Sequence, residues 1–258
     1  MTYAGALVIL ILVGSVIGYL SGSVLYAVHI GKWLGKKDLR KFGSGNPGFT
    51  NTTRVFGWKI GAFVLICDVL KAVIPTLIMF IIYWFSLKNV LDAHITTRYN
   101  PAIFIYFAGF FAVLGHLFPV YYKFKGGKGI ASLGGLLLIM SPFMGATAGL
   151  IIILCVLITR YVSLGSVIAV LLAPFLALVP GVNYTYLMYP DIHFSVWTAV
   201  HEPCIFLPLF GMLLFLGIFI IVLHIPNLKR IAKGVENKFW KIPSKDKVEN
   251  KVPTDIQK

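Results

Sequence analysis

Residues 130–158 read IASLGGLLLIMSPFMGATAGLIIILCVLI and contain no charged residue. This stretch is longer than the roughly 20 residues that one membrane-spanning helix needs. Its centre holds Ser141-Pro142, and proline lacks the backbone N–H that a helix interior requires. The stretch therefore predicts two helices joined near Pro142. We expect a re-entrant hairpin that enters the membrane, turns, and returns to the same side at Arg160.

Five other apolar stretches, at residues 2–28, 60–85, 102–122, 162–179 and 205–223, have the composition of membrane helices. The chain has 258 residues, of which 58% are hydrophobic and only 12% charged, about half the charged fraction of a soluble domain. This composition excludes a water-soluble globule and a disordered chain. Three cysteines without metal-site spacing indicate neither a disulfide framework nor a metal centre. We expect an all-α polytopic membrane protein with about seven transmembrane helices, including the short re-entrant pair.

The basic residues predict the orientation of these helices. The net charge is +14, and twenty of the 23 Lys and Arg residues lie in residues 32–59, in residues 123–128, at Arg160, or from Lys229 onward. The positive-inside rule places these segments in the cytoplasm and the N-terminus outside. Residues 1–240 then form the membrane domain, and residues 241–258 a basic, disordered cytoplasmic tail. Residues 2–28 lack the basic start and cleavage site of a signal peptide, so we interpret them as a retained helix.

Gly14, Gly18 and Gly22 recur every four residues within the first apolar stretch. This spacing places them on one helix face, where the absence of side chains allows a second helix to approach closely. Glycines scattered in a membrane helix without such a role are the alternative.

The first basic segment contains residues 43–54, which read GSGNPGFTNTTR. Glycines allow backbone N–H groups to surround an anion. Short polar side chains lie between them, and Arg54 offers a guanidinium that can bind a phosphate through two hydrogen bonds. These polar residues are Ser44, Asn46, Thr50 and Asn51. The segment predicts a phosphate site, with a solvated loop as the alternative.

The second basic segment reads KGGKG over residues 125–129, directly before the apolar hairpin. A lysine among glycines at a helix N-terminus is typical of a phosphate site, so Gly126, Gly127 and Lys128 are candidates. His116 lies near the end of the preceding apolar stretch, where a hydrogen-bonded helix end is a more common role than a catalytic base. Asp68 and Lys71 share one face of a membrane helix and form either a functional site or a structural pair.

The third basic segment begins with His224 and Asn227, which lie one helical turn apart if this region is helical. Arg160 and Ser163 follow the predicted hairpin, so they would face the same cytoplasmic end. Pro226 suggests a helix break there, and a basic tail against anionic lipid is the alternative for this segment.

Together these segments resemble the motifs of the bacterial acyl-phosphate:glycerol-3-phosphate acyltransferases. Residues 43–54 are similar to the first motif, Asp68 and Lys71 to a following Asp-x-x-Lys, and residues 115–129 to the second motif. Residues 160–163 match a further family segment. The third motif is matched at His224, Asn227, Arg230, Gly234 and Glu236, whereas Ile225 and Pro226 replace its Arg-Glu.

The resemblance implies an integral enzyme of the bacterial plasma (inner) membrane, with its active site facing the cytoplasm. It would transfer a fatty acyl group from acyl phosphate to the 1-hydroxyl of glycerol 3-phosphate, giving lysophosphatidic acid and phosphate, the first step of phospholipid synthesis. The expected partners are acyl phosphate, glycerol 3-phosphate and the lipid bilayer, and we expect no metal, cofactor or nucleic acid.

We assign roles to the candidate residues as a hypothesis of mechanism. The catalytic group is Ser44, Asn46, Arg54 and Lys128; Gly45, Thr50, Gly126 and Gly127 bind acyl phosphate; Arg160, Ser163, His224 and Asn227 bind glycerol 3-phosphate; and Asn51, Asp68, Lys71, His116 and Glu236 support the site. Two other functions fit the same composition. A transporter of an organic phosphate would use broken helices but usually shows an internal repeat, and a lipid-binding protein would bind without turnover.

Overall fold

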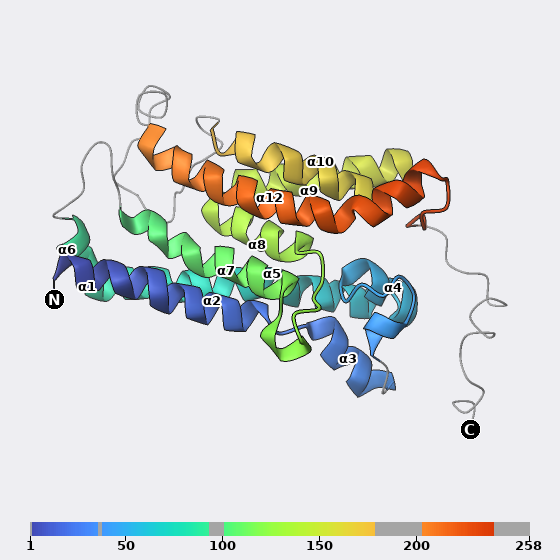
Figure 1. The fold of residues 1–258 in the computed structure, drawn as a ribbon, viewed down its shortest axis with the longest axis horizontal. Coiled ribbons are helices and arrows are strands. Elements are labelled where there is room, and N and C mark those ends of the chain that lie inside the picture. The colour runs from blue at the N-terminus through green and yellow to red at the C-terminus, as the bar shows by residue number, and fades with distance from the viewer. Residues whose placement is uncertain (1, 36–37, 93–100, 179–202, 240–258) are drawn as a thin grey trace.

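The computed structural model describes residues 2–35, 38–92, 101–178 and 203–239, and these residues form helices and connecting turns without a strand. The long helices lie side by side along the longest axis of the molecule (Figure 1). The helix α1, Tyr3–Val8, begins at one end of this bundle, and α12, Pro203–Ala232, finishes at the other. The predicted all-α class is confirmed. Residues 240–258, including the expected tail, lie outside the described residues.

The first span consists of α1, a π-helical turn at Ile9–Val13, and α2, Gly14–Gly22, after which α3, Tyr26–Gly35, turns away from the bundle axis (Figure 1). The glycines of α2 pack against α7, Phe107–Leu117. A Cβ atom on Gly18 would lie 1.9 Å from the Ala108 carbonyl oxygen, and one on Gly22 would lie 2.0 Å from that of Ala112. The predicted glycine face is therefore confirmed as a close helix contact.

The remaining helices follow the predicted apolar stretches. They are α5, Trp58–Ile82, which continues through a π-helical turn at Tyr83–Leu87 into α6, Lys88–Asp92; α7, after a 3-10 turn at Pro101–Tyr106; α8, Ile130–Met140; α9, Pro142–Thr159; α10, Val162–Leu176; and α12. Five helical segments in the described part of the chain are long and apolar enough to cross a membrane, and α8 and α10 are shorter apolar helices. Large apolar side chains such as Ile158 and Phe85, exposed by 81% and 80%, cover the outside.

The break at Ser141-Pro142 is confirmed. Ser141 has an extended backbone, with φ −157° and ψ 123°, and Pro142 is the first residue of α9. Proline suits this position because a first-turn N–H has no partner within the helix. α8 and α9 run in opposite directions (Figure 1). α8 is short, with 11 residues, whereas α9 with 18 residues has the length of a full span.

Two motif segments are helical over stretches that the apolar pattern did not include. α4, Phe49–Phe56, begins inside the first motif. α12 runs nine residues beyond the expected end at 223, and the predicted break at Pro226 is wrong, because the helix continues through this proline. One missing hydrogen bond is tolerated where the helical turns on both sides remain packed in the bundle.

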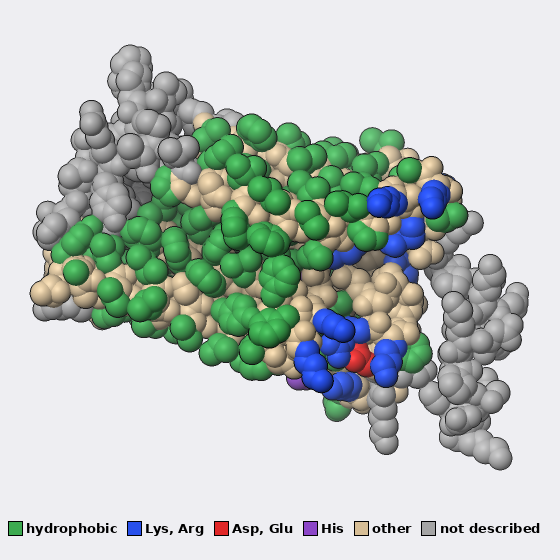
Figure 2. All heavy atoms as spheres, viewed as in Figure 1, with side chains coloured by type: hydrophobic (Ala, Val, Ile, Leu, Met, Phe, Trp, Pro, Cys, Tyr) green, Lys and Arg blue, Asp and Glu red, His purple; other side chains and the backbone are tan. Residues whose placement is uncertain are grey.

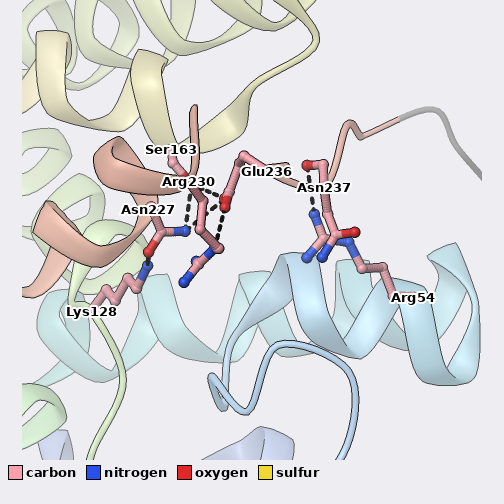
Figure 3. Close-up of polar contacts among 7 residues, drawn as sticks. All are labelled: Arg54, Lys128, Ser163, Asn227, Arg230, Glu236 and Asn237. Atoms are coloured by element: carbon pink, nitrogen blue, oxygen red, sulfur yellow. Dashed lines mark hydrogen bonds and ion pairs between the residues drawn. The ribbon is translucent and has the colours of Figure 1, made fainter. Parts of the chain in front are cut away.

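On the face shown in Figure 2, lysine and arginine side chains gather at one end of the molecule, and apolar side chains cover most of the rest. The three motif segments lie at this end, where α4, the loop before α8, and the last turns of α12 come together (Figures 1 and 3). The Lys128 side chain contacts Asn227, two residues before Lys229, so these two lysines lie at the same end.

Candidate active site

Side chains from three parts of the chain form one hydrogen-bonded cluster at the basic end of the bundle (Figure 3). Lys128 comes from the loop before α8, Ser163 from the first turn of α10, Asn227 and Arg230 from α12, and Glu236 from the segment that follows. The Lys128 ammonium donates to the Asn227 Oδ1. The Asn227 amide nitrogen donates to the Ser163 hydroxyl at 2.8 Å and to Glu236 Oε1 at 2.7 Å. We call these five residues the polar cluster.

Glu236 is the acceptor that holds the polar cluster together. Ser163 donates to its Oε1 at 3.0 Å, and Arg230 Nε donates to its Oε2 at 2.6 Å. Burial by itself would raise the pKa of Glu236, but the hydrogen bonds from Arg230, Asn227 and Ser163 outweigh burial and hold this pKa below its ordinary value. Glu236 is therefore an ionised carboxylate whose charge Arg230 balances.

Lys128 carries a positive charge that no carboxylate in the described part of the chain contacts directly. Burial lowers its pKa to about 8, and the positive charges of Arg230 and Arg54 act in the same direction, whereas Glu236 opposes them. A bound phosphate would reverse the unfavourable environment, because a nearby negative charge favours the protonated amine. The arrangement is suited to binding an anion.

Arg54 projects from α4 toward the segment after α12 and donates to the Asn237 carbonyl at 3.2 Å (Figure 3). Burial lowers its pKa, and the charge of Arg230 adds to this effect against that of Glu236. A guanidinium nevertheless stays charged. The charges of Glu236 and Arg230 both act on Arg54 electrostatically. α4 therefore supplies a second cation beside the polar cluster.

His224 and Asn227 lie on consecutive turns of α12, as the sequence predicted for a helical segment. His224 is 3% exposed, and its Nδ1 lies 2.8 Å from the Ile220 carbonyl oxygen. A carbonyl only accepts, so Nδ1 carries a proton, and Nε2 of the neutral ring has its lone pair available.

Arg160 is not brought into the polar cluster by its side chain, which is exposed. It lies between α9 and α10 with a left-handed backbone, φ 65°. Its carbonyl accepts a hydrogen bond of 2.9 Å from the Phe239 N–H. This bond holds the segment after α12 against the turn that begins α10.

The glycine-rich loop of the first motif is shaped by Asn51, which is 1% exposed. Its Oδ1 accepts from the Ser44 N–H at 2.8 Å, and its amide nitrogen donates to the carbonyls of Leu39 and Phe42 at 3.2 and 2.9 Å. Gly43 has a left-handed backbone, φ 60°, and a Cβ atom there would lie 2.1 Å from the Asn51 Oδ1. Asn51 therefore fixes the backbone of this loop, while its predicted supporting role in the reaction stays a prediction.

The other polar side chains of this loop remain available. Ser44 is exposed, Asn46 and Thr50 are half-buried, and their side chains form no hydrogen bond with the described part of the chain. Gly45 also has a left-handed backbone, φ 75°. These are the predicted anion-binding groups.

The second glycine loop lies on the end of α7. The Gly127 N–H donates to the His116 carbonyl at 3.0 Å, and Gly126 contacts the same carbonyl. Asp68 forms its ion pair with Lys71, at 2.8 Å, and also lies near His116.

Sequence reasoning included Arg230 in the motif match but not among the site residues, and it missed Asn237. The Gly-x-Glu spacing after Arg230 was the available signal for Arg230. Asn237 contributes only its backbone carbonyl, for which a side-chain motif gives no signal.

Comparison with known proteins identifies relatives of this chain. The family model described as glycerol-3-phosphate acyltransferase matches residues 12–234. A glycerol-3-phosphate acyltransferase of Mycoplasma pneumoniae is 39% identical over 92% of this chain and 98% of its own length.

Two solved structures share the fold as well. Crystal structures of PlsY (YgiH), an integral membrane glycerol 3-phosphate acyltransferase, in its glycerol 3-phosphate and lysophosphatidic acid forms have TM-scores of 0.67 and 0.65 and are 31% and 30% identical. Each comparison covers 88% of this chain and 94% of the solved chain. The chain is therefore an integral membrane enzyme that belongs to the glycerol-3-phosphate acyltransferase family.

Proposed function

We propose that this acyltransferase takes its acyl group from an acyl phosphate and transfers it to the 1-hydroxyl of glycerol 3-phosphate. The observation that supports this most is the presence of two cations, Lys128 and Arg54, beside two glycine loops and a set of amide and hydroxyl groups. Glu236 is the carboxylate among them, and Arg230 balances it. The remaining positive charge suits two phosphate-bearing substrates that must lie side by side.

In the proposed reaction, the glycerol 3-phosphate 1-hydroxyl oxygen attacks the acyl carbonyl carbon. The bond between that carbon and the phosphate oxygen breaks, and phosphate leaves with the electron pair. The hydroxyl proton passes to a phosphate oxygen of a substrate. Because the mixed anhydride is already reactive, the protein mainly has to hold two anions together, and such placement is worth about 7–11 kcal/mol in favourable cases.

The acyl phosphate lies at Ser44, Gly45, Asn46, Thr50 and the loop of Gly126, Gly127 and Lys128 in this proposal. Glycerol 3-phosphate lies at Arg54, Ser163, His224 and Asn227, with Arg160 at the edge. Lys128 is placed between the two substrates because it extends from the second glycine loop to Asn227. The relatives whose structures are named for glycerol 3-phosphate and lysophosphatidic acid support this choice of acceptor and product.

The site faces the cytoplasm in this proposal, and the enzyme belongs to the bacterial plasma membrane. The support is the collection of basic side chains at the end of the bundle that also carries the polar cluster (Figure 2), together with the positive-inside rule. The acyl chain would lie along the apolar helices on the inner-leaflet side.

A comparison of acyl donors tests the proposal. Purified full-length protein in detergent is given glycerol 3-phosphate with either palmitoyl phosphate or palmitoyl-CoA. We expect lysophosphatidic acid from palmitoyl phosphate only, since the second phosphate site has a purpose only for that donor. Equal use of palmitoyl-CoA would contradict the assignment of the donor. A phosphate transporter or a non-catalytic lipid-binding protein would give no product from either.

A further inference from the structure

Three polar side chains are buried beneath the second glycine loop. Asp68 and Lys71 come from α5, and His116 comes from the end of α7; their exposed fractions are 1%, 2% and 3%. Charged groups in the interior of a membrane protein are costly and usually have a function. None of the three contacts the polar cluster directly.

The contacts of Lys71 determine the protonation state of His116. The Lys71 ammonium lies 2.8 Å from Asp68 Oδ1, 3.1 Å from the Val24 carbonyl oxygen and 2.5 Å from His116 Nδ1. An ammonium has three donors and no acceptor, so with Lys71 protonated beside Asp68 its ammonium donates to the Val24 carbonyl oxygen and to His116 Nδ1, which accepts. The ring is therefore neutral, with its proton on Nε2. Asp68 Oδ1 lies 3.6 Å from His116 Nδ1, too far for a hydrogen bond.

The same ammonium fixes the backbone at the break between α2 and α3. Val24 lies between these two helices, where its carbonyl is available to a side chain. In addition, the Ser21 hydroxyl donates to the Lys71 carbonyl at 3.0 Å. Lys71 thus joins the first span, α5 and α7 at one point in the bundle.

The His116 ring and carbonyl form the floor of the second glycine loop. A Cβ atom on Gly127 would lie 2.1 Å from His116 Nε2, and one on Gly126 would lie 2.0 Å from the His116 carbonyl oxygen. The Gly127 N–H also donates to that carbonyl. The position of the ring therefore sets the position of the loop, and the next residue of the loop is Lys128.

We propose that Asp68 and Lys71 are positioning residues that act through His116. They fix the ring in the Nε2–H form and in one orientation, and the ring holds the loop at the height where Lys128 contacts Asn227. The inference rests on the proposed function only in taking Lys128 to bind a substrate phosphate. A displacement of about 1 Å in such a group can reduce the rate about a hundredfold.

The first arm of the test measures the ring directly. Nitrogen-15 NMR of histidine-labelled full-length protein in detergent distinguishes protonated from unprotonated ring nitrogens, and the signal missing from His116→Asn identifies the residue. We expect a protonated Nε2 and an unprotonated Nδ1. The opposite tautomer, or a doubly protonated ring, would overturn the proposal. This arm does not depend on any activity, so it holds even if the donor is not acyl phosphate.

The second arm measures KM and kcat in two variants that retain the fold. Asp68→Leu/Lys71→Met removes both buried charges together, because removing one would leave the other unpaired and destabilise the protein. His116→Asn keeps an acceptor for Lys71 but leaves the space under Gly127 empty. We expect the KM of one phosphate substrate to rise about ten- to hundredfold in both variants, with a smaller change in kcat.

The two substrates are varied separately, so the one whose KM rises identifies the phosphate that the loop binds; we expect the acyl phosphate. Thermal unfolding in detergent is measured alongside. Unchanged KM values in both variants would overturn the positioning role, as would losses of activity that only follow the fraction of folded protein.

Discussion

The Lys128 ammonium donates a hydrogen bond to the Asn227 Oδ1, which joins the loop before α8 to α12 across 99 positions of the chain (Figure 3). The same asparagine donates to Ser163 and Glu236. The Asn227 amide therefore orients the Lys128 ammonium through its oxygen and the Glu236 carboxylate through its nitrogen. The geometry of the site thus depends on both the loop before α8 and the end of α12.

Replacement of Lys128 tests the site most locally. We expect Lys128→Ala to reduce kcat/KM at least about a hundredfold, because a cation that holds charge in a site shielded from water contributes several kcal/mol. Lys125→Ala is the matched control, since Lys125 is exposed and lies in the same loop. Steady-state kcat/KM values of both variants in detergent test this prediction. Near-normal turnover of Lys128→Ala would exclude a direct role of Lys128 in substrate binding or catalysis.

The pKa of Lys128, near 8, predicts how substrate binding depends on pH. The protonated amine binds a phosphate and the neutral amine does not. The KM of the substrate whose phosphate Lys128 binds should therefore be constant below about pH 8 and rise above it by up to about tenfold per pH unit. Lys128→Arg should remove this dependence, because arginine remains charged in this range. A KM of the wild-type protein that stays flat from pH 7 to pH 9.5 would contradict the assignment.

Glu236→Gln should destabilise the fold at neutral pH. The change removes the carboxylate that Arg230, Asn227 and Ser163 contact, and the loss should be about 1–3 kcal/mol in the free energy of unfolding. Since these bonds hold the pKa of Glu236 low, its stabilisation is present above the unfolded-state pKa and is lost as pH falls through the folded-state pKa. Thermal unfolding should therefore separate the two proteins at pH 7 and bring them together only as pH falls below about 4.5 and through the lower folded-state pKa of Glu236. Identical midpoints at pH 7 would speak against the carboxylate's structural role.

The contact between α2 and α7 can be tested by adding one methyl group. Gly22→Ala would place its Cβ 2.0 Å from the Ala112 carbonyl oxygen, so the helices must separate and stability should fall. Gly149→Ala is the control, since no atom lies within 4 Å of the corresponding position and alanine favours a helix by about 1 kcal/mol over glycine. Unfolding midpoints that order the variants the other way would show that the bundle does not need this close approach.

Much of the fold is readable from the chain because the membrane imposes simple rules. Apolar stretches gave the spans, Ser141-Pro142 gave the break between α8 and α9, and Gly18 and Gly22 gave a close contact. The helix α4 and the extension of α12 to Ala232 were not predicted. Their sequences are polar or contain proline, so hydrophobic periodicity gives no signal for a helix there. Packing at the end of the bundle determines that these segments are helical.

The residues of the polar cluster could be named from the sequence, but their contacts could not. The order of the motifs pointed to Lys128, Asn227 and Glu236. The hydrogen bonds among them form only because the packing of the helices brings these distant segments to the same end of the bundle. The side chain of Arg160, predicted to bind substrate, is exposed beside the cluster rather than bonded within it. The contact of Lys71 with His116 joins α5 to α7, and no local pattern specifies such a pairing.

The most direct test is the stoichiometry of the reaction itself. Purified full-length protein in detergent is incubated with palmitoyl phosphate and radiolabelled glycerol 3-phosphate, and lysophosphatidic acid and released phosphate are measured over time. We predict one phosphate for each lysophosphatidic acid formed, with both products lost together in Lys128→Ala. Binding of glycerol 3-phosphate without lysophosphatidic acid, or phosphate release without acyl transfer, would contradict the proposed reaction.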